Sequence, residues 1–377
     1  MSKKYARFIS ALFCGCLALV AAANALTPDR AWSELENRPL ALCPTPAVKD
    51  IRSGKFMSDY EAYVTDQFVA RDAWIAAKAY AERAVGKKEN NSVYFCGDAL
   101  ITRFDAPDEK RLTGNIGYVD AFAQKAGVSV YFGLIPTQAN IWADRLPAGA
   151  PNYDQQLVID RAQQGAGSTR FVSLAPTLQA HKDEAIFYRT DHHWTSLGAY
   201  YGYTALAQAM GIEPIPLDSY TKTTVSTEFY GTVFSSSGVR WVEPDSMDTY
   251  VPEEGISVVS HSVDAKGNPI QEQRELYVER YLDVKDKYSM FLGGQQPLGV
   301  VTTGNAVGPK LLIVRDSYSD SLVPFLTPHF SQIHLIDLRY YPSSAAQYIQ
   351  DNGIDMALVL YSVPNFASDS NLVWLRR

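Results

Sequence analysis

The sequence is poor in the residues that build metal centres and disulfide frameworks, because its 377 residues include only six histidines and four cysteines. It also lacks internal repeats and low-complexity tracts. After the N-terminal segment, no apolar run approaches the roughly 20 residues that a membrane-spanning helix needs. Beyond that segment we therefore expect a soluble globular chain. Its 46% hydrophobic content is enough for a large core, in one main domain with an elaboration or smaller lobe.

The first 25 residues have the pattern of a secretory signal peptide. Lys3, Lys4 and Arg7 form a basic start, an apolar segment follows, and Ala23-Asn24-Ala25 supplies small residues at the cleavage position. An uncleaved membrane anchor is the alternative interpretation. The pattern predicts an extracytoplasmic protein, either secreted or in the cell envelope, with no stable membrane span after cleavage.

Negative charge predominates. The formal net charge is −7, and removal of three cations with residues 1–25 moves it to −7 − 3 = −10. Nucleic-acid affinity depends on Lys and Arg at phosphates. An acidic exported protein is therefore not expected to bind nucleic acid.

Two cysteines, Cys43 and Cys96, lie outside the signal-like segment. Outside the cytoplasm they can form one disulfide, and a loop of that length would contribute about 4 kcal/mol in the chain-entropy model. The alternative is a pair of unpaired, buried thiols.

The pattern of apolar residues divides the mature chain. Residues 26–110 predict an N-terminal helical segment and a hairpin. Residues 111–216 and 301–377 predict alternating helices and strands, with continuous apolar strands such as Leu311 to Val314. Such strands are typical of a parallel sheet covered on both faces, so we expect a three-layer α/β fold. Residues 217–300 lose helical periodicity and predict a β-rich insertion.

The most informative motif is Asp191-His192-His193-Trp194, directly before a good helix start at Thr195. Imidazole is the side chain best suited to proton transfer near neutral pH, and a carboxylate partner orients it. We expect His193 to act as a general base and Asp191 to hold it in the correct tautomer.

A matching nucleophile follows much later, where the apolar run Leu311 to Val314 ends at Asp316-Ser317. Ligand sites of open parallel sheets form at the carboxyl ends of the strands, and helix N-terminal amides there suit an oxyanion. Ser317 is therefore the candidate nucleophile. Gln138, just beyond the strand ending at Ile135, is also placed to line the cleft.

Each of these residues also has a plainer interpretation. Asp-Ser after a strand commonly caps a helix. The Asp191/His192/His193 cluster suggests a metal site as well. However, adjacent residues rarely aim both rings at one ion, and the other four histidines form no spaced ligand pattern. We therefore predict no metal and no cofactor, and keep a metal-dependent hydrolase as a third possibility.

The motif resembles the one that names the DHHW family of exported bacterial proteins, and further blocks resemble that family over nearly the whole mature chain. These blocks are Asp66-Gln67-Phe68-Val69-Ala70-Arg71-Asp72, Tyr188-Arg189-Thr190, Phe291-Leu292-Gly293-Gly294, Asp316-Ser317-Tyr318 and Asp337-Leu338-Arg339-Tyr340-Tyr341.

The DHHW pattern is in turn similar to SGNH hydrolase-like acetyltransferases that modify alginate and other exopolysaccharides. The resemblance implies an SGNH-hydrolase-like sheet in circularly permuted order, with Asp191, His193 and Ser317 as the catalytic residues. Trp194 matches the tryptophan of that motif. Asp316 stands where threonine is usual, and this departure leaves transfer and hydrolysis both open.

The same resemblance implies the remaining site residues. Asn365, beyond the strand ending near Tyr361, is the candidate oxyanion asparagine, and Arg339 is a candidate substrate or anion contact. Their plainer roles are a turn residue after Pro364 and a surface ion pair. His192 and Trp194 complete the expected substrate and oxyanion set.

Together these patterns predict an exported, serine-dependent carbohydrate O-acetyltransferase or acetylesterase. The expected substrate is a cell-envelope or exopolysaccharide glycan, and a membrane protein would be the acyl donor. The alternative is a non-catalytic glycan-binding or cell-envelope protein that retains the SGNH-like fold.

Overall fold

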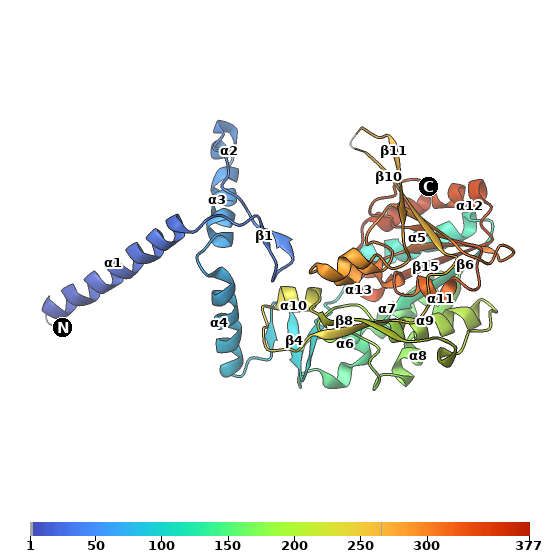
Figure 1. Cartoon of the computed structure of the whole chain (residues 1–377), viewed down its shortest axis with the longest axis horizontal. Helices are drawn as coiled ribbons and strands as arrows, with labels where there is room; N and C mark the ends of the chain where they lie inside the picture. Colours follow the sequence, from blue (N-terminus) through green and yellow to red (C-terminus); the bar gives the residue numbers. More distant parts are fainter. Residues whose placement is uncertain (1–2, 265) are drawn as a thin grey trace. The chain divides into compact units, whose positions relative to one another are not determined.

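The computed structural model describes residues 3–264 and 266–377, which divide into two compact units (Figure 1). The smaller unit contains the described residues up to Asn91 together with Gly238–Arg240. The larger unit contains Ser92–Ser237 and Trp241–Arg377. The Asp-His-His-Trp motif and Ser317 both belong to the larger unit.

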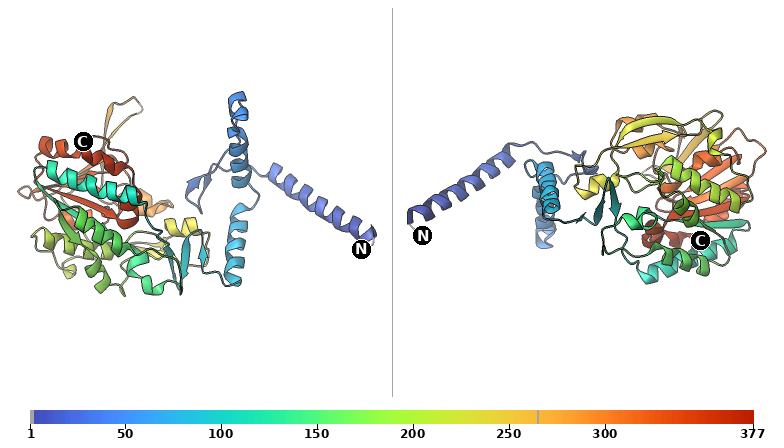
Figure 2. Two further views of the ribbon diagram at one scale, coloured as in Figure 1. Left: turned by 180° about the vertical axis from the view of Figure 1, so that it is seen from behind. Right: turned by 90° about the horizontal axis from the view of Figure 1, so that it is seen from below.

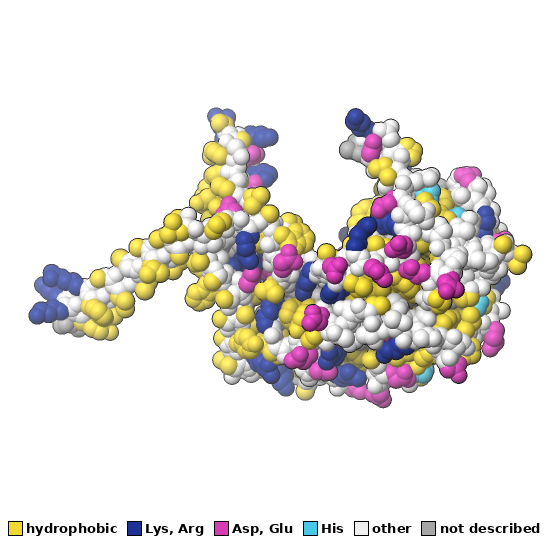
Figure 3. Space-filling view, in the orientation of Figure 1, with side chains coloured by type: hydrophobic (Ala, Val, Ile, Leu, Met, Phe, Trp, Pro, Cys, Tyr) yellow, Lys and Arg dark blue, Asp and Glu magenta, His cyan; other side chains and the backbone are white. Residues whose placement is uncertain are grey.

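The smaller unit is mainly helical. One helix in the described part of the chain, α1, is long and apolar enough to cross a membrane; Figure 3 shows hydrophobic side chains along it and basic ones at its N-terminal end. The elements of the smaller unit are α1 (Lys3–Leu26), β1 (Trp32–Ser33), β2 (Arg38–Pro39), α2 (Val48–Arg52), α3 (Lys55–Asp66), α4 (Arg71–Ala84) and β3 (Glu89–Asn90).

Ion pairs join the short strands of this unit to its helices. The carboxylate of Asp66, at the end of α3, lies 2.6 Å from the Arg38 guanidinium and also accepts from the Ala41 N–H at 2.9 Å. Glu36 lies 2.9 Å from both Arg38 and Arg71. These ion pairs therefore connect the end of α3 and the start of α4 to the β1–β2 loop.

A central eight-stranded sheet organises the larger unit, in the order β11-β10-β12-β14-β13-β15-β6-β7. The five strands from β14 to β7 run parallel, and β12, β10 and β11 continue the sheet antiparallel. The strands are β6 (Ser129–Ile135), β7 (Arg170–Ser173), β10 (Ser257–Val263), β11 (Pro269–Arg274), β12 (Leu298–Thr302), β13 (Lys310–Arg315), β14 (Gln332–Ile336) and β15 (Met356–Ser362).

Helices cover both faces of this sheet (Figures 1 and 2). On β6, Phe132 packs against Phe366 of α13, whereas the adjacent Gly133 faces Leu206 of α9. Because successive strand residues point to opposite faces, α13 and α9 lie in different layers. This arrangement confirms the predicted three-layer α/β class, with a large and mostly parallel sheet.

The covering helices form two groups. In the first group, α5 (Glu109–Lys125) and α7 (Gln155–Gly165) contact α13 (Val363–Ser368), and α12 (Ala345–Asn352) contacts α5. In the second group, α8 (Ala175–Ala180) and α11 (Val323–Leu326) contact α9 (Ser196–Ala209). Shorter helices α6 (Gln138–Ile141), α10 (Thr232–Ser237) and the 3-10 turn η5 (Ser317–Ser319) lie near strand ends and loops.

Residues 217–300 do not form one separate body. The strands β8 (Thr223–Phe229) and β9 (Asp245–Thr249) make a small antiparallel sheet of their own, whereas β10, β11 and β12 extend the central sheet. The predicted hairpin is β4 (Val93–Cys96) and β5 (Ala99–Thr102), with Val93 paired to Thr102. It belongs to the larger unit rather than to the N-terminal helices.

The possible disulfide between Cys43 and Cys96 stays a prediction, because Cys43 belongs to the smaller unit and Cys96 to the larger one. Cys43 is exposed and Cys96 is buried. Burial raises the pKa of the Cys96 thiol to about 11, because its thiolate would have little solvation.

Candidate active site

The Asp-His-His-Trp motif lies on a tight loop whose ends are clasped together. A β-bridge joins Phe187 to Trp194, and the Tyr188 N–H donates to the His193 carbonyl at 3.3 Å. After the loop, the Thr195 hydroxyl accepts from the Gly198 N–H and caps α9, as the sequence predicts. The motif is therefore held between a bridge and a helix start.

Two buried side chains fix this loop from outside. Asp245 of β9 accepts from the Thr190 hydroxyl at 2.6 Å and from the backbone N–H groups of Arg189 and Thr190 at 3.0 and 2.8 Å. From α6, the Gln138 amide donates to the Asp191 carbonyl at 2.7 Å. Both residues thus position the backbone from which the candidate catalytic side chains project.

Ser317 follows β13 at the carboxyl edge of the parallel sheet and is half-buried. Its neighbour Asp316 is buried and caps η5 by accepting from the Tyr318 N–H at 3.1 Å. The second carboxylate oxygen of Asp316 accepts from the Ser362 N–H, the Ser362 hydroxyl and the Asn365 amide, each at 2.8 Å. These hydrogen bonds of Asp316 connect the end of β13 to the end of β15 and thereby fix the position of Ser317 at the edge of the sheet.

The loop and the strand end bring three side chains into a chain of hydrogen bonds. His193 Nε2 lies 2.8 Å from Ser317 Oγ, although 124 positions separate the two residues in the sequence. On the other side of the ring, His193 Nδ1 lies 2.6 Å from Asp191 Oδ1. Donor and acceptor on this ring follow from the carboxylate: Nδ1 donates to Asp191, and Nε2 accepts from Ser317. This is the geometry of an activated serine nucleophile.

Asp191 is fully buried yet held as a carboxylate. Burial raises its pKa, but the neighbouring His192 and His193 rings and the hydrogen bonds from His193 and Thr232 outweigh burial, so the pKa lies well below its usual range. Thr232 donates to Asp191 Oδ2 from its backbone at 2.7 Å and from its hydroxyl at 2.9 Å. The preceding Gly231 leaves room for this contact, because a Cβ there would lie 2.2 Å from the Asp191 Cβ.

Tyr288 forms a wall behind the imidazole of His193. The two rings are stacked, with centroids 3.7 Å apart and planes inclined by 7°. The Tyr288 hydroxyl donates to the Ser317 carbonyl at 3.2 Å and contacts the Ser321 hydroxyl at 3.0 Å.

Gly293 and Gly294, a few residues after Tyr288, have φ angles of 75° and 79°. This left-handed conformation favours glycine.

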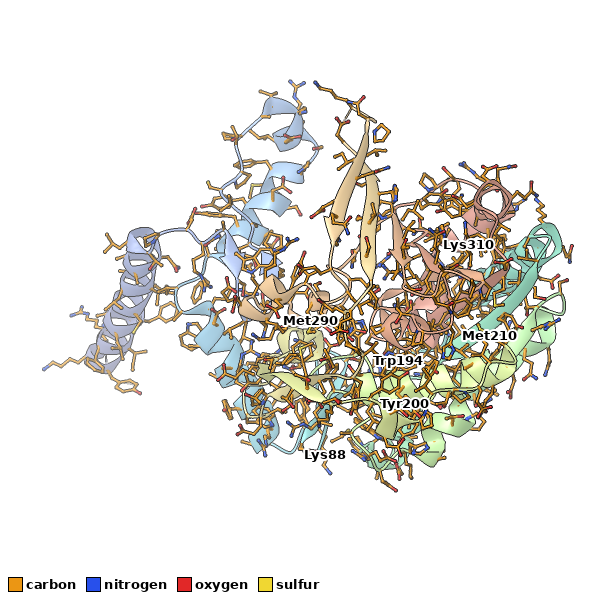
Figure 4. The ribbon with its side chains drawn as sticks, turned by 45° about the vertical axis from the view of Figure 1, so that its right-hand side comes forward. Lys88, Trp194, Tyr200, Met210, Met290 and Lys310 are labelled. Atoms are coloured by element: carbon orange, nitrogen blue, oxygen red, sulfur yellow. The ribbon has the colours of Figure 1, made fainter. Side chains whose placement is uncertain are left out.

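Trp194 is fully buried and does not reach solvent; Figure 4 labels it in the interior of the larger unit. Its indole N–H donates to the Tyr318 carbonyl at 2.8 Å and to the Ser321 hydroxyl at 3.0 Å. The structure therefore corrects the expectation that Trp194 contacts substrate. Its indole instead connects the motif loop to the segment that follows Ser317.

A cavity of about 350 Å³ opens beside this constellation, and His192 contributes to its wall. Its remaining lining residues come from β5 and the loop after it, from α6, from α10 and from the ends of β13 and β15. They are Thr102, Arg103, Phe104, Thr137, Gln138, Thr232, Val233, Ser236, Tyr318, Ser362, Pro364 and Asn365. No carboxylate is among them, and the volume is that of a small-molecule site.

The other candidate residues occupy different positions. Arg339 forms a two-pronged ion pair with the buried Asp337, at 2.9 and 2.6 Å, and does not line this cavity. Its expected role as a substrate or anion contact stays a prediction. Gln138 and Asn365 do line the cavity. The Gln138 amide donates to the Asp191 and Tyr188 carbonyls, at 2.7 and 3.3 Å, so both of its hydrogens are engaged. The Asn365 amide donates one hydrogen to Asp316 and has a second one.

The same cluster has the composition of a small metal site. One ligand atom each from Asp191, His192 and His193 lies within 4.8 Å of the others. However, both nitrogens of His193 have protein partners, Asp191 and Ser317, and His192 Nδ1 lies 2.6 Å from the Thr232 hydroxyl. These contacts suit proton transfer and leave few lone pairs for an ion.

Sequence reasoning missed Thr232, Gly231 and Tyr288. All three belong to residues 217–300, whose composition gives no functional signal. Thr232 lies 41 positions from Asp191, and Tyr288 lies 29 positions before Ser317. Their proximity to the site arises from the tertiary fold, and a single sequence provides no signal that could have found them.

Comparisons with known proteins agree with this description. No curated protein sequence matches the chain significantly. A DHHW family protein from Eubacterium siraeum is 26% identical over 76% of this chain and 96% of its own, with a TM-score of 0.66. Bacillus cereus PatB1 with a sulfonyl adduct is 22% identical over 76% and 98%, with a TM-score of 0.63. The O-acetyltransferase domain of Pseudomonas putida AlgJ is 14% identical over 74% and 93%, with a TM-score of 0.47.

The family assignment rests on sequence as well as on structure. The model of the family described as "DHHW protein" matches residues 91–336, which is well over half of the chain. That range includes the Asp-His-His-Trp loop, Thr232, Tyr288 and Ser317. The chain therefore belongs to the DHHW family.

Proposed function

We propose that this protein is an exported, serine-dependent carbohydrate O-acetyltransferase or acetylesterase that acts on cell-envelope or exopolysaccharide glycans. The observation that carries the proposal is the unbroken hydrogen-bond chain Ser317–His193–Asp191, with links of 2.8 and 2.6 Å. A hydroxyl bonded to a neutral imidazole, whose other nitrogen faces a buried carboxylate, is arranged for nucleophilic attack on an acyl carbonyl.

In the first half-reaction, Ser317 Oγ attacks the carbonyl carbon of an acetyl ester while His193 Nε2 takes the hydroxyl proton. The new Oγ–carbon bond gives a tetrahedral oxyanion. When the bond to the leaving alcohol breaks, His193 returns the proton to that alcohol. Asp191 stays charged throughout, since its pKa lies well below its usual range, and it stabilises the imidazolium that forms.

Two donors near Ser317 suit the oxyanion. The Ser317 backbone N–H has no partner among the described residues and lies at the start of η5. The second amide hydrogen of Asn365 belongs to a side chain that lines the cavity, and the first fixes the amide by its bond to Asp316. Preorganised donors of this kind usually make the largest single contribution to acyl transfer.

In the second half-reaction, an acceptor hydroxyl replaces the leaving alcohol. His193 takes its proton, the acceptor oxygen attacks the acetyl carbon, and the bond to Ser317 Oγ breaks as the proton returns to that oxygen. A glycan hydroxyl gives transfer, and water gives hydrolysis. Asp316 does not choose between them, because its carboxylate is buried and fully engaged in joining β13 to β15.

The N-terminal helix supports an extracytoplasmic location for this chemistry. Its basic start and apolar length suit a secretory signal. Acetyl groups outside the cytoplasm have to be supplied across the membrane, so a membrane protein as acyl donor belongs to the proposal. The resemblance to exopolysaccharide acetyltransferases supports a glycan as the acceptor.

The proposal is tested by trapping the nucleophile. A fluorophosphonate or sulfonyl fluoride should modify the purified protein at Ser317, as identified by peptide mapping, and 4-nitrophenyl acetate should release 4-nitrophenol. Ser317→Ala should abolish both. Ser319→Ala is the matched control, because that hydroxyl is buried and bonds only the Asp316 carbonyl at 2.8 Å.

The outcome also separates the enzyme from a glycan-binding protein with the same fold. Full ester turnover in Ser317→Ala would contradict the mechanism. A wild-type protein that binds glycans, yet takes neither the phosphonyl nor the acetyl group, would support the binding protein instead.

A further inference from the structure

The second histidine of the motif has no part in the chain Ser317–His193–Asp191, yet it lies against it. The His192 and His193 rings have centroids 3.8 Å apart and planes inclined by 37°. His193 is buried, whereas the His192 side chain is 38% exposed and lines the cavity. A structural imidazole would be expected to turn away from the cavity, so its position calls for a chemical explanation.

Counting hydrogens assigns the tautomer of His192. The Thr232 hydroxyl has one hydrogen, and it donates this to the Asp191 carboxylate at 2.9 Å. The 2.6 Å contact between Thr232 Oγ1 and His192 Nδ1 is therefore donated by the ring. His192 then carries its proton on Nδ1, and in the neutral ring Nε2 is an acceptor.

That acceptor is open. His192 Nε2 has no partner among the described residues and is not among their buried, unpaired polar atoms. Partial burial and the adjacent His193 lower the pKa of His192 to about 4, so the ring stays neutral at ordinary pH. A neutral acceptor facing a cavity is suited to a ligand that donates a hydrogen bond.

The two rings share one carboxylate as a neighbour. His193 Nδ1 lies 2.6 Å from Asp191 Oδ1, and His192 Nδ1 lies 3.7 Å from the same oxygen. The ring planes are tilted by 37° and the centroids are 3.8 Å apart, so His192 is the ring next to the base. His193 Nε2 meets Ser317 Oγ, and the adjacent His192 ring lines the cavity.

We infer that His192 Nε2 accepts a hydrogen bond from a second hydroxyl of the acyl acceptor, next to the hydroxyl that His193 deprotonates. The site would then select acceptors with two neighbouring hydroxyls, as on a sugar ring, over water and simple alcohols. This inference rests on the proposed acyl chemistry. It assigns His192 a role in choosing the acceptor, while His193 remains the base.

Transfer to such an acceptor makes and breaks the same bonds as the second half-reaction. The acetyl carbon bonds to the acceptor oxygen and its bond to Ser317 Oγ breaks, while the acceptor proton passes through His193 to Oγ. His192 neither gains nor loses a proton. It only holds the neighbouring hydroxyl, and water has no second hydroxyl to offer.

Two variants of His192 distinguish the hydrogen bond that Nε2 would accept from the hydrogen bond that Nδ1 donates to Thr232. In His192→Asn, the amide N–H can replace Nδ1 toward Thr232, but nothing replaces Nε2. In His192→Gln, the longer amide can present its oxygen near the position of Nε2. The acceptors are ethane-1,2-diol and ethanol, which differ in the second hydroxyl, with 4-nitrophenyl acetate as donor.

The measurement is the ratio of transfer to hydrolysis, which cancels any change in the acylation rate. Wild type should favour the diol over ethanol. In His192→Asn the ratio for the diol should fall roughly 5- to 10-fold, as expected for loss of one hydrogen bond, while the ratio for ethanol stays unchanged. His192→Gln should recover part of the diol preference.

Three results would overturn the inference alone. These are a wild-type enzyme that is acetylated but shows no preference for the diol, an unchanged diol ratio in His192→Asn, and an equal loss for both alcohols. A wild-type protein that gives no burst of 4-nitrophenol would overturn the proposed function as well, so the two failures can be distinguished.

Discussion

Tyr288 stacks face to face on His193, with ring centroids 3.7 Å apart, and its hydroxyl donates to the backbone carbonyl of Ser317. One side chain thus restrains both the plane of the base and the position of the nucleophile. Neither contact belongs to the hydrogen-bond chain from Ser317 to Asp191. Tyr288 is therefore a positioning residue, and its two contacts can be tested separately.

Tyr288→Phe keeps the stacked ring and removes the hydroxyl, whereas Tyr288→Leu removes the stack as well. Loss of a ring pair worth about 0.5–1.5 kcal/mol should slow fluorophosphonate labelling of Ser317 by roughly 2- to 12-fold in Tyr288→Leu beyond the effect in Tyr288→Phe. Labelling rates at several pH values check this expectation. Equal rates in both variants would assign the whole effect to the hydroxyl.

Gly231 gives a second test of the site, through Asp191. A methyl group at this position would lie 2.2 to 2.6 Å from the side chain of Asp191, which is too close for any real contact. Gly231→Ala should displace the carboxylate, so labelling of Ser317 should fall by at least about 100-fold, in line with the cost of misplacing a catalytic group.

Gly117→Ala is the control for Gly231→Ala. Gly117 lies in α5 and a Cβ there meets nothing within 4 Å. Alanine is the better helix former by up to about 1 kcal/mol, so this variant should label normally and unfold at an equal or higher temperature. Normal labelling in Gly231→Ala would show that the Asp191 contact is dispensable.

Local patterns of the sequence predict the elements of the sheet well. The strand expected to end at Ile135 is β6 (Ser129–Ile135), and the helix expected to start at Thr195 is α9 (Ser196–Ala209). Apolar runs and capping residues act over a few positions, so one sequence is enough. The fold class followed from these elements together with the family resemblance.

Long-range contacts set the limit of this reasoning. The candidate nucleophile and base were identified because a strand end and a rare histidine pair each carry a local signal. Thr232 lacks such a signal, since a threonine after a glycine is common and only the fold brings it to Asp191. The sequence predicts a separate insertion where β10, β11 and β12 extend the central sheet. The alternation of apolar and polar residues does not reveal which edge of a sheet a strand joins.

Trp194 shows how a motif residue can be predicted and its role mistaken. The indole is fully buried, and its N–H donates to Tyr318 and Ser321. Trp194→Phe should leave the Tyr318 carbonyl without this donor, remove one of the contacts of the Ser321 hydroxyl and open a cavity, with a loss of about 2–4 kcal/mol in the free energy of unfolding.

Chemical denaturation of Trp194→Phe measures that loss. If the tryptophan acted on substrate instead, the KM for an ester would rise while the stability stayed unchanged. The structure predicts the reverse: lower stability, with KM of the folded fraction little altered.

Asp66 gives a pH-dependent prediction for the smaller unit. A hydrogen bond from Arg38 lowers the pKa of Asp66, partial burial opposes this shift, and a hydrogen bond from the Ala41 N–H adds to it. The resulting pKa is about 2. An unfolded aspartate titrates near 3.9. The folded form therefore binds its proton more weakly, so this carboxylate stabilises the fold above about pH 4, and its contribution is lost as the pH falls toward 2.

Hydrogen exchange of α3, corrected for intrinsic rates, measures this contribution. Asp66→Asn should lower the protection of Lys55–Asp66 by about 1–2 kcal/mol at pH 7, since the Arg38 side chain is 40% exposed and solvent screens the pair. At pH 2 most of this difference should be gone, because the wild-type carboxyl is then about half protonated in the folded form and almost fully protonated in the unfolded form. Asp59→Asn, on the same helix but exposed and paired with Lys55, should leave the protection of α3 unchanged at either pH, because solvent screens this pair. A pH-independent loss in Asp66→Asn would mean that the side chain acts through its shape and not through its charge.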